Sequence, residues 1–212
     1  MRRAGQLSWR IEIDEPEPLV IGLFVRDAAG LTTTHDWLPH AVPVIPQVDG
    51  EAPVEAARQW DLWWDRALQL DLDLEGQRQG QLGASWWTPP DFEALRSAPA
   101  LQAVVASHFF DAVAWSRERK REHIDLMVGL PDPRSGRRER NGRGIVETRL
   151  VADLEHQLGR LARPFQLRIT EIPVAGKQLW QLDPHHVLLT AGLLRDSDEY
   201  RRQITPVVQA LL

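Results

Sequence analysis

Cysteine is absent from all 212 residues of the chain. This absence excludes disulfide frameworks, cysteine–zinc sites, iron–sulfur clusters and catalysis by a thiol. A chain of this length is expected to bury roughly 70% of its extended-state surface, so it needs no covalent staple for stability. A protein without cysteine is suited to a reducing compartment, and we expect a cytoplasmic location.

Long hydrophobic runs are missing as well. The longest apolar stretch, residues 19–25, is much shorter than the roughly 20 residues that a membrane span needs. Two arginines near the start precede no apolar run, so we expect no secretory signal peptide. These features predict a soluble protein that has no membrane partner.

The usual signatures of catalysis and nucleotide binding are also lacking. The sequence contains no G-x-S-x-G elbow, no S-x-x-K, no H-E-x-x-H and no phosphate-binding glycine loop of the P-loop type. Gly142-Arg143-Gly144 precedes a predicted helix, but it matches no dinucleotide-binding pattern. We therefore expect no cofactor and no metal, and a protein without catalytic activity.

The charge is mildly acidic and strongly biased toward arginine. The net charge is −5 and the pI is about 5.8, which disfavours general binding to nucleic acid. Among 25 basic residues only Lys120 and Lys177 are lysine. GC-rich codon usage accounts for this bias, whereas selection for bidentate pairing with carboxylates or phosphates is the alternative.

One segment concentrates arginine and glycine. Residues 129–144 contain four glycines, two prolines and five arginines, at positions Arg134, Arg137, Arg138, Arg140 and Arg143. The simplest interpretation is a flexible surface loop. The functional interpretation is a grip on an acidic protein partner or on phosphates, with nucleic acid as the less favoured partner.

Tryptophan is abundant, with nine residues beside a single tyrosine. Trp60 and Trp64 fall on the apolar side of a predicted helix, so Trp64 is expected in the core. Trp63 projects elsewhere and is predicted to be the exposed member of its cluster. Together with Trp86 and Trp87 it is a candidate binding residue, because tryptophan is the commonest anchor of interfaces. Packing inside the domain is the alternative.

A long helix predicted over residues 101–128 carries a polar stripe. His108, Asp111, Glu118 and Glu122 lie within an arc of about 100° at helical spacing. Such a stripe is an alternative catalytic site, with an acid/base pair or a divalent metal. A solvated helix face with neighbouring arginines is the simpler interpretation. The adjacent pair His185-His186 is likewise expected to be structural rather than metal-ligating.

The pattern of segments predicts an α+β fold. We expect an N-terminal antiparallel β meander with strands over residues 7–13, 19–25 and 31–38. An irregular proline-containing stretch over 39–53, a helix over 54–70 and the long helix follow. A helix over 145–162, a hairpin of residues 165–174 and 177–182, a strand over 187–190 and a last helix complete the chain. Asp196 with Glu199 three residues later resembles a capping box that opens this last helix. The predicted divisions are residues 1–128, the loop 129–144 and residues 145–212, or one continuous domain.

These observations favour a non-catalytic protein that binds other protein chains, as a homo-oligomer or as a subunit of a larger assembly. An enzyme of unrecognised type that uses the polar stripe is the first alternative. A phosphate or nucleic-acid contact through the arginine-rich loop is the second.

Overall fold

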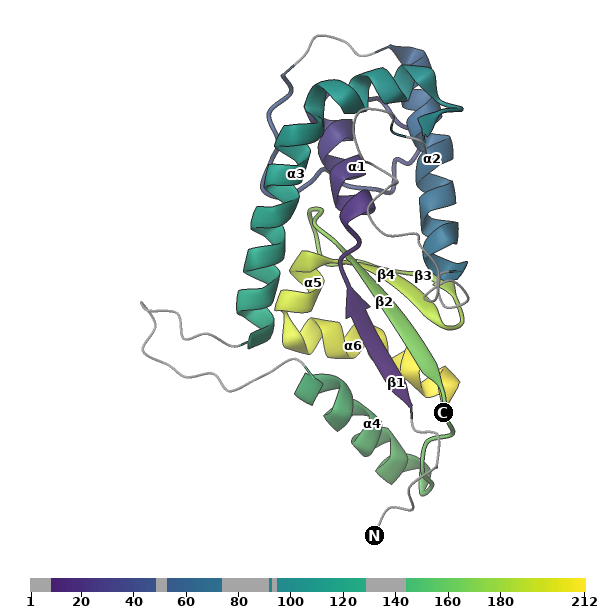
Figure 1. The fold of residues 1–212 in the computed structure, drawn as a ribbon. Coiled ribbons are helices and arrows are strands. Elements are labelled where there is room, and N and C mark those ends of the chain that lie inside the picture. The colour runs from purple at the N-terminus through teal and green to yellow at the C-terminus, as the bar shows by residue number, and fades with distance from the viewer. Residues whose placement is uncertain (1–8, 49–52, 74–91, 93–94, 129–143) are drawn as a thin grey trace, which may run out of the picture. The chain divides into compact units, whose positions relative to one another are not determined.

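The computed structural model describes residues 9–48, 53–73, 92, 95–128 and 144–212, and these form six helices and one four-stranded sheet (Figure 1). The elements in chain order are β1 (Arg10–Asp14), α1 (Glu17–Ala28), α2 (Val54–Asp73), α3 (Pro99–Val128), α4 (Gly144–Leu158), β2 (Gln166–Ile172), β3 (Leu179–Asp183), β4 (His186–Thr190), α5 (Ala191–Arg195) and α6 (Ser197–Leu211). The predicted α+β class is confirmed.

Contacts between residues divide the chain into two compact units, and each unit is built from segments that are not consecutive in the sequence. Unit 1 comprises residues 1–14, 119–172 and 176–212, and unit 2 comprises residues 15–118 and 173–175. Strand β1 therefore belongs to the same unit as the C-terminal elements. Of the predicted linker 129–144, only its last residue is among those described, so a domain boundary there stays a prediction.

Unit 1 contains the sheet, in the order β1-β2-β4-β3. Strands β1 and β2 are parallel, as are β2 and β4, whereas β3 runs antiparallel to β4. The predicted hairpin of residues 165–174 and 177–182 is wrong, because β4 lies between β2 and β3 in the sheet. The predicted N-terminal meander is also wrong: β1 pairs with β2, a strand more than 150 residues away in the sequence.

Alternation along the strands builds the core of unit 1. Leu167 and Ile169 of β2 and Val187 and Leu189 of β4 share one face, and all four are fully buried. Helices α4 and α6 cover this face with apolar side chains that include Leu150, Leu154, Ile204 and Val208 (Figure 1). Both helices carry their apolar residues at three- and four-residue spacing, as a helix that covers a sheet requires.

The first element of unit 2 is a helix rather than the predicted strand. Residues 19–25, predicted as a central strand, are part of helix α1. Pro18 stands in the first turn, where its fixed φ and missing N–H are tolerated. The helix is apolar on nearly all sides because it is buried on nearly all sides, from Leu19 to Val25. An apolar run of seven residues fits a buried helix as well as a buried strand.

The turn after α1 ends a helix rather than joining two strands. Gly30 has φ +62°, its N–H donates to Asp27 O at 3.2 Å, and Leu31 N donates to Arg26 O at 2.9 Å. This pair of bonds is the Schellman arrangement, which glycine favours because it adopts a positive φ without strain. Residues 31–38 that follow contain no strand, so the third predicted strand is wrong.

The two longer helices of the sequence analysis are confirmed. Helix α2 begins directly after Pro53, and α3 begins at Pro99. Helices α1 and α2 pack together, and the side-chain carbonyl of Gln59 in α2 accepts a 3.0 Å hydrogen bond from Leu101 N in α3. Helix α4 ends four residues earlier than predicted because Gly159 adopts φ +64°.

Candidate functional site

The tryptophans of α2 form a buried cluster. Trp60 and Trp64 are fully buried and stack with their ring centroids 5.1 Å apart, and Trp60 Nε1 donates to Gly22 O at 2.9 Å. Trp63 is only 6% exposed, so its predicted exposure is wrong. It stands three residues after Trp60 and thus on the same buried side of the helix. Trp86 and Trp87 lie outside the described residues.

The polar stripe predicted on the long helix is not assembled as one exposed face. His108 is 5% exposed and belongs to the buried line of α3 with Val105 and Ala112. Asp111 and Glu118 are exposed, and the side chain of Glu122 lies outside the described residues. The edge of the buried face therefore passes between His108 and its acidic neighbours, which removes the histidine from the solvated stripe.

His185 and His186 have different environments. His185 is exposed, and its Nδ1 lies 3.0 Å from Gln166 O. His186 is buried, and its Nε2 lies 2.8 Å from Thr170 Oγ1. Burial, followed by the positive charge of Arg168, lowers the pKa of His186 to about 4 despite the opposing effect of Asp183. Each imidazole thus has its own hydrogen-bonding partner, and the expectation that neither binds a metal stays a prediction.

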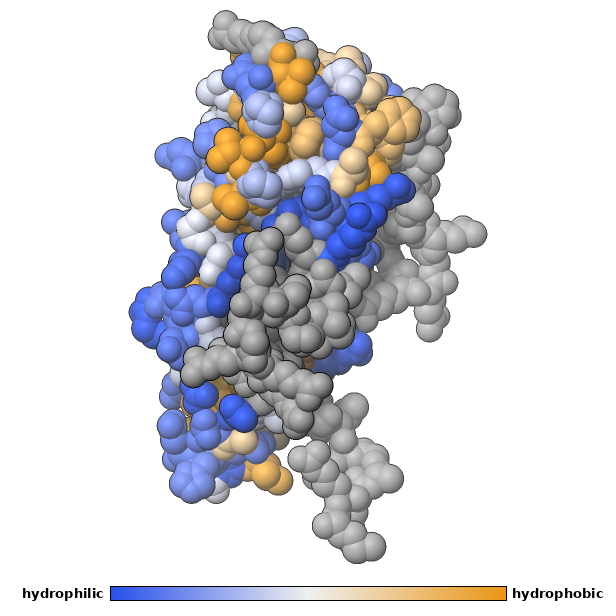
Figure 2. All heavy atoms as spheres, turned by 90° about the vertical axis from the view of Figure 1, so that its left-hand side faces the viewer, coloured by the Kyte–Doolittle hydropathy of each residue, from blue (hydrophilic) through white to orange (hydrophobic). Residues whose placement is uncertain are grey.

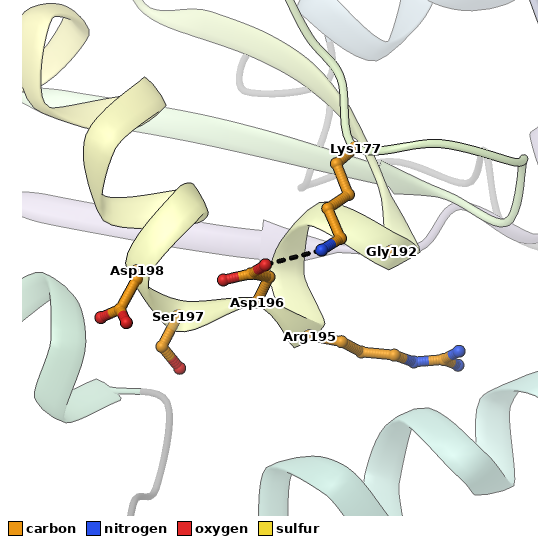
Figure 3. Close-up of a pocket in the computed structure, with 6 residues that line it drawn as sticks. All are labelled: Lys177, Gly192, Arg195, Asp196, Ser197 and Asp198. Carbon is orange, nitrogen blue, oxygen red and sulfur yellow. Dashed lines mark hydrogen bonds and ion pairs between the residues drawn. The ribbon is translucent and has the colours of Figure 1, made fainter.

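A shallow hollow of about 370 Å³ lies in unit 1 where α5 meets α6. It is lined by Lys177, Gly192, Arg195, Asp196, Ser197 and Asp198 (Figure 3). The ammonium of Lys177 points toward the carboxylate of Asp196, 2.6 Å away, whereas the side chain of Arg195 extends away from this pair. Their hydrogen bond raises the pKa of Lys177 and lowers the pKa of Asp196.

A helix cap and a close backbone approach account for the arrangement of the residues that line the hollow. Asp196 caps α6 by accepting a 3.1 Å hydrogen bond from Glu199 N, as the Asp196–Glu199 spacing in the sequence predicts. A Cβ at Gly192 would lie 2.5 Å from Gly176 O, so glycine permits the close approach of the preceding turn. The charges in the hollow are of both signs and largely exposed, so water screens their effect on any ligand.

Unit 2 contains a buried ion pair that holds a neighbouring segment of the chain. Arg26 and Asp27, 4% and 8% exposed, are joined by a 2.7 Å bond from Arg26 Nε to Asp27 Oδ1. The guanidinium also donates to Leu38 O and Pro39 O, at 3.3 and 2.7 Å. Asp27 Oδ2 accepts from Ala41 N at 2.6 Å. The pair therefore fixes the segment after residue 37 to the end of α1.

The segment held in this way continues as residues 41–48 (AVPVIPQV), which we call the strap. Val42 N donates to Pro173 O at 2.8 Å, and Val48 N donates to Ala28 O at 2.9 Å. Ala41 and Ile45 face inward and pack with Ala28, against Phe24 and Trp115. The strap is thus fixed at both ends and near its middle.

Three valines of the strap face outward. Val42, Val44 and Val48 are 39%, 82% and 70% exposed, and Trp37 just before the strap is 36% exposed. Figure 2, which views the left-hand side of Figure 1, shows hydrophobic surface in several patches over unit 2. Contiguous exposed apolar surface, unlike single scattered apolar side chains, is typical of a site that contacts another molecule.

No sequence pattern marked the strap as functional. Residues 39–53 were predicted to be extended and irregular, and the irregular part of this prediction is confirmed for residues 39–48, which form no helix and no regular strand. The usable signal was the spacing of Pro43 and Pro46 among valines. The five arginines proposed for binding, Arg134, Arg137, Arg138, Arg140 and Arg143, lie outside the described residues, so their role stays a prediction.

Comparison with protein-family models, with curated proteins and with solved structures finds no match to this chain. Within the described ranges, no helix has the length and apolarity that a membrane crossing requires. In that same part of the chain, no three histidine, aspartate or glutamate side chains are arranged to hold a metal ion.

Proposed function

We propose that this protein is a non-catalytic binding subunit that associates with other protein chains through the strap of unit 2. The observation that supports this most directly is the exposure of Val44, which is 82% exposed at the centre of a segment pinned at both ends. Each valine fully buried by a partner contributes roughly 1.5–3 kcal/mol.

The way in which the strap is held supports a binding role. A flexible loop would lose conformational entropy on association, at about 0.5–1.5 kcal/mol for each side chain that is immobilised. The bonds from Arg26 and to Asp27 order the backbone in advance, and the buried side chain of Ile45 fixes the middle. A partner thus meets a surface that is already in its bound form.

A substitution on the exposed side of the strap tests this proposal. We expect Val44→Asp to leave the fold intact, because this side chain is 82% exposed, and to raise the dissociation constant of the complex at least tenfold. Val54→Asp is the matched control, since Val54 is 84% exposed but lies in the first turn of α2, away from the strap in sequence.

The measurement has two stages. Light scattering of the purified full chain, with and without each substitution, detects self-association. A partner recovered with the tagged chain is then purified, and calorimetry gives the affinity of the pure pair. The proposal is wrong if the chain is monomeric and no purified partner binds it, or if Val44→Asp binds as tightly as the unmodified chain.

A further inference from the structure

The two units carry net charges of opposite sign. Unit 2 contains 16 acidic and six basic residues, a net charge of −10, whereas unit 1 contains 14 acidic and 19 basic residues, a net charge of +5. The mild charge of the whole chain, −5, is therefore the sum of two opposite charges, and the strap belongs to the acidic unit. A domain with so large a negative charge attracts cationic partners and repels anionic ones, most strongly at low salt.

Carboxylates close to the strap have no arginine or lysine beside them. Residues 27–57, which contain the strap, include no lysine and no arginine. Asp36 is exposed directly before Trp37, and its carboxylate makes no hydrogen bond or ion pair with any described residue. The side chain of Asp65 in α2 is 58% exposed, and its charged partner in the described part of the chain is His35, whose Nε2 lies 3.4 Å from Asp65 Oδ1. These two carboxylates are thus available to a cation from another molecule.

The indole of Trp37 lies next to these carboxylates. It meets the imidazole of His35 edge-on, with ring centroids 5.7 Å apart, and the same imidazole contacts Asp65. Trp37 is 36% exposed, and the strap begins four residues after it. A partly exposed tryptophan beside carboxylates suits a guanidinium or an ammonium group, because the face of the ring and the carboxylates both attract a cation.

Resting on the proposed function, we propose that the partner of the strap is a basic polypeptide segment, in which arginine or lysine side chains stand between apolar ones. Its apolar side chains pack on Val44 and Val48, which are 82% and 70% exposed. Its cationic groups lie over Trp37 and pair with Asp36 and Asp65. The burial of the valines supplies most of the affinity, whereas the charges select the partner and speed its association.

Other partners fit the charge of unit 2 less well. Nucleic acid and anionic membranes are repelled by a unit with a net charge of −10. A second copy of the chain offers unit 1, but its charge of +5 neutralises only half of that of unit 2, and each added copy brings a further −5 to the assembly. A basic partner of different sequence has neither limit, and the second copy is one of the outcomes that the experiment separates.

The experiment measures, by calorimetry, the binding of three short synthetic peptides to the full chain. Arginine alternates with leucine in the first peptide, glutamate replaces arginine in the second, and serine replaces leucine in the third. We expect the arginine–leucine peptide to bind at least about tenfold more tightly than either of the others, because it alone offers both charge and apolar surface. Its dissociation constant is expected to rise at least about threefold between about 0.05 and about 0.5 M salt.

Substitutions then locate the site of this peptide. Asp36→Lys is expected to raise its dissociation constant at least about threefold. Glu17→Lys is the matched control, because Glu17 is also exposed and in unit 2 but lies at the start of α1, whereas the strap is held at its end. At about 0.15 M salt the Debye length of about 8 Å is shorter than the roughly 15 Å of helix between Glu17 and Asp27, so a change below about twofold is expected. Circular dichroism confirms that each variant is folded.

The outcomes separate this inference from the function on which it rests. Val44→Asn serves here because it removes an apolar contact without adding an acidic group. The inference is overturned if the arginine–leucine peptide binds no better than the glutamate–leucine peptide, or if Asp36→Lys leaves its binding unchanged. If Val44→Asn weakens a native complex that neither salt nor Asp36→Lys affects, the binding function stands and the basic partner is wrong. If light scattering shows a dimer that Val44→Asn dissociates, the occupant is a second copy and the inference is likewise overturned. If neither substitution changes any association, both proposals fail.

Discussion

The indole of Trp63 occupies the space that a side chain at position 22 would need. A Cβ at Gly22 would lie 2.4 Å from Cζ3 and 2.5 Å from Cη2 of Trp63. Both residues belong to helices, α1 and α2, so neither backbone yields easily. The close approach of these two helices therefore depends on the pairing of the smallest residue with the largest.

We expect Gly22→Ala to destabilise the protein. In a free helix this change gains up to about 1 kcal/mol, but here the added methyl overlaps an aromatic ring, and overpacking costs about 1–3 kcal/mol. Urea denaturation measures the difference. In a Trp63→Phe background the smaller ring leaves room, so Gly22→Ala is expected to cost less there. Equal costs in both backgrounds would show that the ring is not the cause.

The buried pair Arg26–Asp27 predicts a large effect of removing one charge. Asp27→Asn leaves the guanidinium of Arg26 buried without its counter-charge, which typically costs about 3–5 kcal/mol. The double substitution Arg26→Met with Asp27→Asn is expected to cost less than the sum of the two single ones. Denaturation of all three variants tests this, and a cost below about 1 kcal/mol for Asp27→Asn would contradict it.

The lowered pKa of His186 predicts that the protein loses stability in mild acid. Its pKa is about 4 in the folded protein and 6.5 when unperturbed, so the unfolded chain takes up the proton first as the pH falls. The contribution of neutral His186 to the free energy of unfolding is complete above pH 6.5 and is lost as the pH falls to 4. The loss amounts to roughly 2–3 kcal/mol between pH 7 and pH 4.5. Denaturation at these two pH values measures it.

Two variants isolate the part that His186 plays. His186→Gln retains a group that can bond Thr170 Oγ1 but does not titrate, so its stability is expected to fall less between pH 7 and pH 4.5. His185→Gln, at the neighbouring exposed position, is expected to show the same decrease as the unmodified protein. A decrease that is unchanged in His186→Gln would assign the acid sensitivity to other groups.

Two substitutions of Asp196 separate its role as a helix cap from its role in an ion pair. Asp196→Ala removes the acceptor for Glu199 N at the start of α6, which costs about 1 kcal/mol. Asp196→Asn keeps this acceptor and removes only the exposed pair with Lys177, so a smaller loss is expected. Thermal melting compares the two variants. A loss as large for Asp196→Asn as for Asp196→Ala would mean that the ion pair, and not the cap, stabilises the helix.

Elements with long periodic patterns and strong end signals were predicted well. Helices α2 and α3 begin at or directly after prolines and repeat apolar residues over four turns or more, so local sequence was sufficient. Residues 19–25 were misassigned because an apolar run without periodicity fits either a buried strand or a buried helix. The pairing of β3 with β4 was missed because strand order depends on contacts with the distant β1 and β2.

Candidate site residues were predicted less well because exposure is a property of the packed structure. The projection that made His108 part of a wet stripe could not locate the edge of the buried face, which passes between His108 and Asp111. The projection of Trp63 failed similarly, since its ring is buried by packing against Gly22 of another helix, α1. The strap depends on Arg26 and Asp27, whose bonds to residues 38–41 no local pattern indicates.

The sequence by itself determined the mixed class, the long helices, the cap at Asp196 and the lack of any thiol chemistry, because composition, periodicity and capping act within a few residues. Only the tertiary structure decided which strands are neighbours, which tryptophans are buried and which valines remain in water. These properties arise from contacts between residues far apart in the chain, and burial is decided by what packs on a side chain rather than by its neighbours in sequence.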